Sequence, residues 1–152
     1  VGNNNLLMEG VHVAHDTIVG NGCIIGNKTK MAGEVIIDDN AIVSGVVLMH
    51  QFCHVGSYVM IQGGCRFSKD IPPYIIAGRD PIAYCGINIV GLRRRGFTNE
   101  QIEIIHNAYR IIYNSGKNVT EAIAQIKAEM PMTPEIEYII SFVENSQRGI
   151  IR

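Results

Sequence analysis

Apolar residues recur at every sixth position through the first half of the chain. Stepping by six from Val1 reaches twelve apolar residues in succession, and the residue four places after each is mostly small or β-branched. A hexapeptide period of this kind is typical of a parallel β-helix, in which each repeat supplies one short strand and one turn. The twelve apolar positions are Val1, Leu7, Val13, Val19, Ile25, Met31, Ile37, Val43, Met49, Val55, Ile61 and Phe67.

The same period predicts which residues lie close together. Because side chains alternate between the two faces of a strand, the aliphatic residue and the small residue of each hexad both point into a narrow interior. Three hexads close one coil, so residues 18 apart stack at a strand spacing of ~4.8 Å, and residues 1–71 form roughly four coils. Val1 already occupies the aliphatic position. We therefore expect the chain to begin within a β-helix, with further coils before it.

The second half of the chain has a different pattern. The hexads stop at residues 70–73, where two consecutive prolines cannot donate ladder hydrogen bonds. We expect a connector over residues 72–97 and a three-helix C-terminal domain over residues 98–152. Thr98 and Gln101 form the pattern of a capping box, and Gly116 is a suitable end for that first helix. A second helix is predicted over about residues 120–129, and Pro134 opens a third.

Composition and charge exclude several classes of function. The chain has 152 residues, 47% of them hydrophobic, and a net charge of −1 without a broad basic stretch, so nothing indicates nucleic-acid binding. No apolar run approaches the ~20 residues of a membrane span. Cys23, Cys53 and Cys65 fall on the inward small position and are expected in the core. Reduced thiols suit a cytoplasmic protein.

Candidate catalytic chemistry centres on His15 and Asp16. A carboxylate beside an imidazole orients the ring and stabilises its protonated form, as a general base requires, provided that the two residues lie at a turn. Gly33 lies 18 residues further on and Gln51 another 18, so the three should stack. A glycine there lets a ligand reach the backbone N–H, although it is equally explained as an ordinary turn glycine. Arg93, Arg94 and Arg95 suit a phosphate or form a solvated charged run.

Several motifs resemble one family along the whole chain. They are Asn4-Asn5-Leu6-Leu7-Met8, His12-Val13-Ala14-His15-Asp16, His50-Gln51-Phe52-Cys53, Asp70-Ile71-Pro72-Pro73-Tyr74, Gly91-Leu92-Arg93-Arg94-Arg95-Gly96-Phe97 and Arg148-Gly149-Ile150-Ile151-Arg152. The chain is similar to the C-terminal part of the acyl-[acyl-carrier-protein]–UDP-N-acetylglucosamine O-acyltransferases, which catalyse the first step of lipid A synthesis. The resemblance implies a left-handed parallel β-helix, a homotrimer, and active sites between subunits.

The resemblance also implies roles for individual residues. His15 corresponds to the general base, Asp16 to its orienting carboxylate, and Gly33 to the donor for the thioester oxyanion. The donor is acyl carrier protein with its phosphopantetheine thioester, the acceptor is UDP-N-acetylglucosamine, and neither a metal nor another cofactor is implied. Gly63 matches the position that limits acyl length. Residues around the UDP-sugar and phosphopantetheine correspond to His12, His50, Gln51, Asn88, Arg94 and Arg95.

This sequence departs from some members of the family at two positions. Glu34 stands where they have a substrate-contacting histidine, and Val90 stands where they have a glutamate near the nucleotide.

Three alternative functions remain open from the sequence. They are the N-acyltransferase of the same pathway, a β-helix carbonic anhydrase with zinc on His15, His50 and His54, and an inactive structural fragment.

Overall fold

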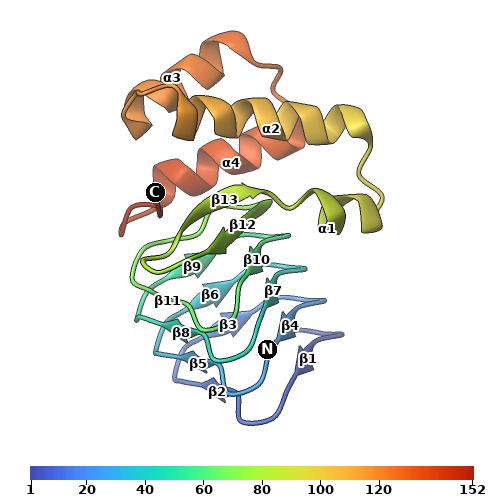
Figure 1. The fold of residues 1–152 in the computed structure, drawn as a ribbon, viewed down its shortest axis with the longest axis vertical. Helices are drawn as coiled ribbons and strands as arrows, with labels where there is room; N and C mark the ends of the chain where they lie inside the picture. The colour runs from blue at the N-terminus through green and yellow to red at the C-terminus, as the bar shows by residue number, and fades with distance from the viewer. The chain divides into compact units, whose positions relative to one another are not determined.

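The computed structural model describes residues 1–152, and its first half is a parallel β-solenoid (Figure 1). Eleven two-residue strands follow one another at six-residue spacing, as the hexads predict. They are β1 (Leu6–Leu7), β2 (His12–Val13), β3 (Ile18–Val19), β4 (Ile24–Ile25), β5 (Lys30–Met31), β6 (Ile36–Ile37), β7 (Ile42–Val43), β8 (Leu48–Met49), β9 (His54–Val55), β10 (Met60–Ile61) and β11 (Arg66–Phe67).

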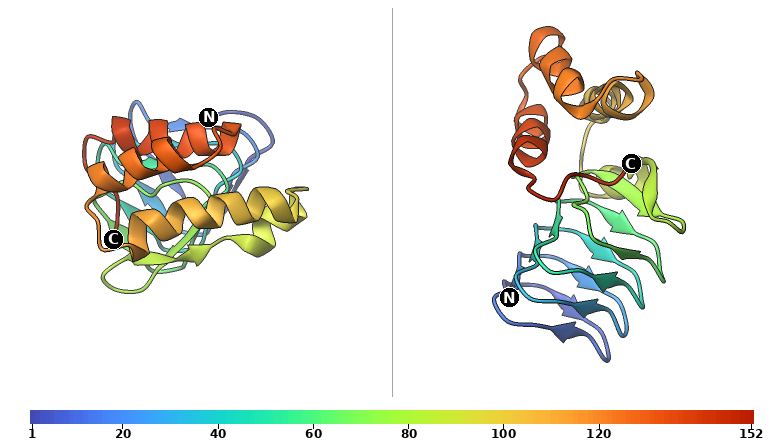
Figure 2. Two further views of the ribbon diagram at one scale, coloured as in Figure 1. Left: turned by 90° about the horizontal axis from the view of Figure 1, so that it is seen from above. Right: turned by 90° about the vertical axis from the view of Figure 1, so that its left-hand side faces the viewer.

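Every third strand stacks on the same side of the solenoid. Side 1 contains β1, β4, β7 and β10, side 2 contains β2, β5, β8 and β11, and side 3 contains β3, β6 and β9. The pairs are parallel with partners 18 residues apart, for example His12 with Lys30. Figure 2 shows the resulting coils stacked one on the next. The predicted stacking period, the roughly four coils and the left-handed winding are confirmed.

The core of the solenoid is a column of inward-pointing side chains. Between β4 and β10 the second residue of each strand is almost fully buried, as are the small residues four places later, among them Val35, Val47 and Val59. Cys23, Cys53 and Cys65 are buried, as predicted, and none of them forms a disulfide. Burial raises the pKa of the Cys53 thiol to about 11, so this thiol stays neutral and packs as a small hydrophobe.

The corners between the sides need left-handed backbone. Their second turn residue has φ near +60° even where it is not glycine, as at Asp16, Glu34 and Val46. Polar side chains at inward positions support the corners by bonding to the next coil. The Cys23 N–H donates to Asn5 Oδ1 (2.7 Å) and the Val47 N–H donates to Thr29 Oγ1 (3.2 Å). Different residue types can therefore occupy the corners, while the turn shape and its hydrogen bonds stay the same.

The stretch that we expected to be a connector, residues 72–97, contains regular structure. β12 (Ile75–Gly78) adds to side 1 in parallel with β10, and β13 (Ala83–Ile87) follows it as an antiparallel strand. Pairing continues past the two prolines because Ile75 and Ala77 keep their side chains in the core. This first unit comprises Val1–Asn88 and also Ser146–Arg152. The C-terminal segment pairs with the buried Asp70, whose backbone N–H donates to the Gly149 carbonyl and whose carbonyl accepts from the Ile151 N–H.

The second unit, Ile89–Asn145, is helical. It contains α1 (Ile89–Arg94), α2 (Asn99–Asn114), α3 (Val119–Glu129) and α4 (Pro134–Asn145). The three longer helices and the Thr98–Gln101 capping box are confirmed, whereas the short α1 carries no clear periodic signal in the sequence. None of the helices is both long enough and apolar enough to cross a membrane.

Two neighbouring isoleucines on β6 test the inward and outward positions. Ile37 is fully buried and Ile36 is 37% exposed. We expect Ile37→Ala to lower the free energy of unfolding by about 2–5 kcal/mol, because it leaves a cavity in a core that cannot collapse. Ile36→Ala should cost distinctly less. Urea unfolding of both variants measures the difference, and equal losses would contradict the assigned facing.

Candidate active site

The candidate site lies on the corner between side 2 and side 3. His15 and Asp16 form the turn after β2, Gly33 and Glu34 the turn after β5, and Gln51 opens the turn after β8. Backbone hydrogen bonds hold these turns in register, since the Glu34 N–H donates to the His15 carbonyl (2.9 Å). The stack of His15, Gly33 and Gln51 that the 18-residue spacing predicts is therefore present.

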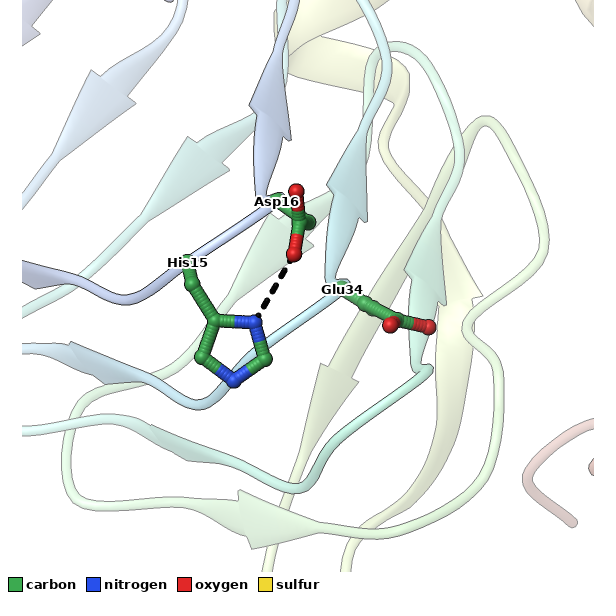
Figure 3. A group of neighbouring side chains, drawn as sticks. All are labelled: His15, Asp16 and Glu34. Atoms are coloured by element: carbon green, nitrogen blue, oxygen red, sulfur yellow. Dashed lines mark hydrogen bonds and ion pairs between the residues drawn. The ribbon is translucent and has the colours of Figure 1, made fainter.

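His15 and Asp16 form a hydrogen-bonded pair (Figure 3). His15 Nδ1 lies 3.0 Å from Asp16 Oδ2, and the side chains are 66% and 75% exposed. Adjacent residues on a strand would point to opposite faces, but the positive φ of Asp16 turns its carboxylate back to the ring. With Nδ1–H donating to the carboxylate, the imidazole presents the lone pair of Nε2 to an incoming ligand. This is the arrangement of an oriented general base.

Gly33 lies directly against the imidazole. A Cβ at this position would be 2.4 Å from His15 Cε1 and 2.5 Å from Nε2, so the ring can occupy its place only over a glycine. The Gly33 N–H has no hydrogen-bond partner within the chain. Packing alone therefore explains why residue 33 is glycine. The same geometry also brings a free N–H donor close to the basic nitrogen.

A groove runs along the outward face of side 2, beside this corner. Its volume is about 660 Å³, and it is lined by Ala32, Leu48, Met49, His50, Gln51, Arg66, Phe67 and Ser68. Ala32 is the chain neighbour of Gly33, so the groove begins at the corner that carries the histidine. His50 Nδ1 lies 3.2 Å from the Gln51 carbonyl oxygen. Both residues were expected near the substrates, and both are exposed in the groove.

The other predicted site residues lie in different places. His12 is exposed on β2, in register with Lys30, and Gly63 is exposed at the opposite edge of side 2, in the turn between β10 and β11. Asn88 is buried directly after β13, and its Nδ2 donates a hydrogen bond to the Tyr58 carbonyl (3.0 Å). Arg94 and Arg95 are exposed at the end of α1, in the second unit.

One cluster offers metal-ligand atoms. A nitrogen of His15 and carboxylate oxygens of Asp16 and Glu34 lie within 4.8 Å of one another, all on exposed side chains (Figure 3). Exposed acidic groups commonly gather without an ion, and we propose no metal here. His50 and His54 do not join the cluster. His54 Nε2 lies 2.9 Å from Asp38 Oδ1 on side 3, so the three-histidine zinc alternative finds no support in this chain.

Two of these neighbours were not predicted from the sequence. Glu34 lies beside His15 and Asp16 because position 34 stacks on position 16, which the 18-residue period already implied. The His54–Asp38 pair joins adjacent coils diagonally, because His54 stacks on Ile36 and Asp38 lies two residues further along the chain. Neither pair could be recognised from residue types alone.

Comparisons with known proteins agree along the chain. Residues 70–151 match the family described as "Udp N-acetylglucosamine O-acyltransferase; Domain 2", and residues 1–33 match the bacterial transferase hexapeptide repeats. The chain is similar to the acyl-[acyl-carrier-protein]–UDP-N-acetylglucosamine O-acyltransferase of Aliivibrio salmonicida, with 44% identity over all 152 residues. It spans 58% of that relative's length.

Solved structures give the same likeness. The chain resembles LpxA, a UDP-N-acetylglucosamine acyltransferase from Bacteroides fragilis 9343, with 77% identity and a TM-score of 0.99 over the whole chain and 60% of that structure. It also resembles LpxA from Acinetobacter baumannii, with 44% identity and a TM-score of 0.93 over 98% of the chain and 58% of that structure.

Gly33→Ala tests the contact between the imidazole and the backbone. The new methyl group must displace the ring, and we expect the 3.0 Å bond from Nδ1 to Asp16 to be lost. Because the ring is exposed, the free energy of unfolding should change by less than about 1 kcal/mol. A crystal structure and urea unfolding measure both effects. Gly63→Ala is the control, since its Cβ would meet nothing closer than 3.3 Å.

Proposed function

Since this chain belongs to the UDP-N-acetylglucosamine O-acyltransferase family, we propose that the protein transfers a 3-hydroxy fatty acyl group from acyl carrier protein to the 3-hydroxyl of UDP-N-acetylglucosamine. This is the first step of lipid A biosynthesis, and a cytoplasmic location fits both substrates. The observation that carries the proposal is the His15–Asp16 pair lying over the free N–H of Gly33. A base and an oxyanion donor at one exposed corner are what acyl transfer to an alcohol requires.

His15 acts first as a general base. Its Nε2 takes the proton of the sugar hydroxyl as the oxygen attacks the thioester carbonyl carbon, and Asp16 stabilises the imidazolium that forms. The carbonyl oxygen becomes an oxyanion that accepts a hydrogen bond from the Gly33 N–H. The tetrahedral intermediate then collapses, the C–S bond breaks, and the departing thiolate takes the proton from His15. No metal or other cofactor takes part in these steps.

Positioning supplies the remainder of the rate enhancement. General base catalysis typically contributes ~10²–10⁴-fold, and correct alignment of the two substrates contributes more. We assign this alignment to individual polar side chains that the family resemblance points to. His12, His50 and Gln51 contact the substrates from side 2, and Asn88, Arg94 and Arg95 act on the nucleotide and phosphopantetheine. Arginine suits these phosphates because it can form two parallel hydrogen bonds.

The outward faces of the solenoid support a homotrimer. The outward residue on every strand of side 1 is aliphatic or methionine, and none of the five is charged. They are Leu6, Ile24, Ile42, Met60 and Ile76. A continuous apolar column on the surface of a folded unit commonly marks an interface. Association of three copies would bury these columns and cover the exposed corner at His15.

We expect sedimentation equilibrium at micromolar concentration to give the mass of a trimer. Ile42→Asp places a charge in the middle of the side 1 column and should shift the equilibrium towards monomer, because a carboxylate is costly to bury without a partner. Val46→Asp is the control, because Val46 is 55% exposed on a corner. A stable monomer of the unaltered protein would contradict shared sites.

His15→Ala tests the base in the full-length protein. We expect kcat to fall by roughly 10²–10⁴-fold, with little change in stability because the ring is exposed and leaves no cavity. Asp16→Asn should give a smaller loss, since it keeps the ring in place but removes the negative charge. Transfer of labelled acyl groups to UDP-N-acetylglucosamine measures both. Near-normal turnover of His15→Ala would remove this residue from the mechanism.

Gly63→Met tests the limit on acyl length. Gly63 is exposed and its Cβ position is open apart from the Gly45 carbonyl at 3.3 Å, so a methionine would extend outward into the space beside side 2. Each methylene excluded from an apolar groove forfeits ~0.8 kcal/mol, so preference should move towards chains a few carbons shorter.

Turnover on acyl carrier proteins loaded with 3-hydroxy chains of graded length measures this preference. Asn27→Met is the matched control, because residue 27 occupies the same corner position two coils away. An unchanged length profile for Gly63→Met would show that Gly63 lies outside the acyl groove.

A further inference from the structure

Glu34 lies beside the His15–Asp16 pair without a bond of its own. One of its carboxylate oxygens is within 4.8 Å of a nitrogen of His15 and of a carboxylate oxygen of Asp16. Its side chain is exposed and forms no hydrogen bond or ion pair within the chain. Figure 3 shows both acidic side chains on the same side of the ring, with a bond drawn only from Asp16. The reaction steps proposed above therefore give this negative charge no role.

The stacking of the corners determines where this carboxylate can turn. Glu34 occupies the same turn position as Asp16 one coil later, and φ is +59° at both residues. The two side chains therefore leave the backbone in the same direction, one strand spacing (~4.8 Å) apart. The residue stacked on the other side of Glu34 is Phe52, whose side chain offers no hydrogen-bond donor. Rotation about the bonds of an exposed glutamate can thus bring its carboxylate to the imidazole of His15.

A second carboxylate matters when His15 becomes charged. Taking the hydroxyl proton on Nε2 converts the ring into an imidazolium, and an opposite charge within about 4–6 Å favours that form. Asp16 already accepts the hydrogen bond from Nδ1, so Glu34 acts through its charge without a bond to the ring. This charge is not neutralised within the chain, since neither carboxylate is paired with a lysine or an arginine.

We propose that Glu34 is a second carboxylate partner of His15, an inference that rests on the proposed function. Its charge stabilises the imidazolium beside Asp16, and its carboxylate accepts the hydrogen bond from Nδ1–H when Asp16 is removed. Glu34 is a positioning residue, because it acts through the imidazole and gains no proton itself. The proton of the sugar hydroxyl still moves to Nε2 and leaves with the thiolate.

A cycle of single and double variants in the full-length protein tests this role. Glu34→Gln keeps the shape of the side chain and should lower kcat about threefold, the scale of one exposed charge pair, with KM unchanged. Asp16→Ala should lower kcat further, yet leave Glu34 to orient the ring. The double variant should fall roughly tenfold below the product of the two single losses, because no carboxylate remains. Left-handed corners of the solenoid already hold Val46 and Phe52, so Asp16→Ala should fold.

Two further variants separate charge from shape and place. Glu34→Asp keeps the negative charge and should retain most of the unaltered kcat. Glu9→Gln is the matched control, because Glu9 is an exposed acidic turn residue of the same solenoid and lies on a corner without the histidine. This control undergoes the same change of charge and should leave both kcat and KM unchanged.

The nitrogen chemical shifts of labelled His15 test the pairing without turnover. The tautomer of a neutral imidazole follows the hydrogen bond that its other nitrogen makes, and the shifts report which nitrogen carries the proton. The Nδ1–H form should dominate in the unaltered protein and in Asp16→Ala, and it should give way to the Nε2–H form only in the double variant.

The possible outcomes are distinguishable. A higher KM for UDP-N-acetylglucosamine with unchanged kcat in Glu34→Gln would overturn the proposal by assigning Glu34 to sugar binding. Single losses that simply multiply, or loss of the Nδ1–H form in Asp16→Ala alone, would overturn it as well. Failure of the unaltered protein to transfer the acyl group would instead contradict the proposed function, and the chemical shifts would still decide the pairing.

Discussion

Backbone hydrogen bonds between residues 18 apart hold the solenoid together, and the candidate site depends on the same bonds. Each strand contributes only two residues to its pairs, so no single strand is stable alone and each coil relies on the coils next to it. The bond from the Glu34 N–H to the His15 carbonyl is one of this series. It fixes the height of the imidazole above Gly33. A change of register by one residue would reverse the faces of the strand and disperse the site.

The corners of the solenoid make this rigid stacking useful for chemistry. A strand would direct His15 and Asp16 to opposite faces, and only the left-handed turn brings the carboxylate to the ring. At the next coil, the ring covers a glycine whose N–H has no partner. A hydrogen-bonded base and a free donor are therefore held by backbone rather than by flexible side chains. Preorganised groups of this kind need little rearrangement when charge develops during a reaction.

Side 2 of the solenoid connects the proposed functions in space. One of its edges carries His15 and Gly33, the opposite edge carries Gly63, and its outward face forms the groove. An apolar column on side 1 supports contact with further copies of the chain. The division of roles follows from a three-sided shape, in which each side can present a different surface while the interior stays uniform.

The sequence by itself determined the solenoid, because a strict period of six favours an arrangement that directs the aliphatic residue of each hexad into one interior. It also determined the three longer helices, through capping residues and apolar stripes, and the stack of His15, Gly33 and Gln51. The tertiary structure alone decided what depends on contacts between coils or on local backbone angles. Such features are the turn that joins Asp16 to His15 and the His54–Asp38 pair. β12 and β13 also escaped prediction, because their pairing follows from the open edge of side 1 rather than from any repeat of their own.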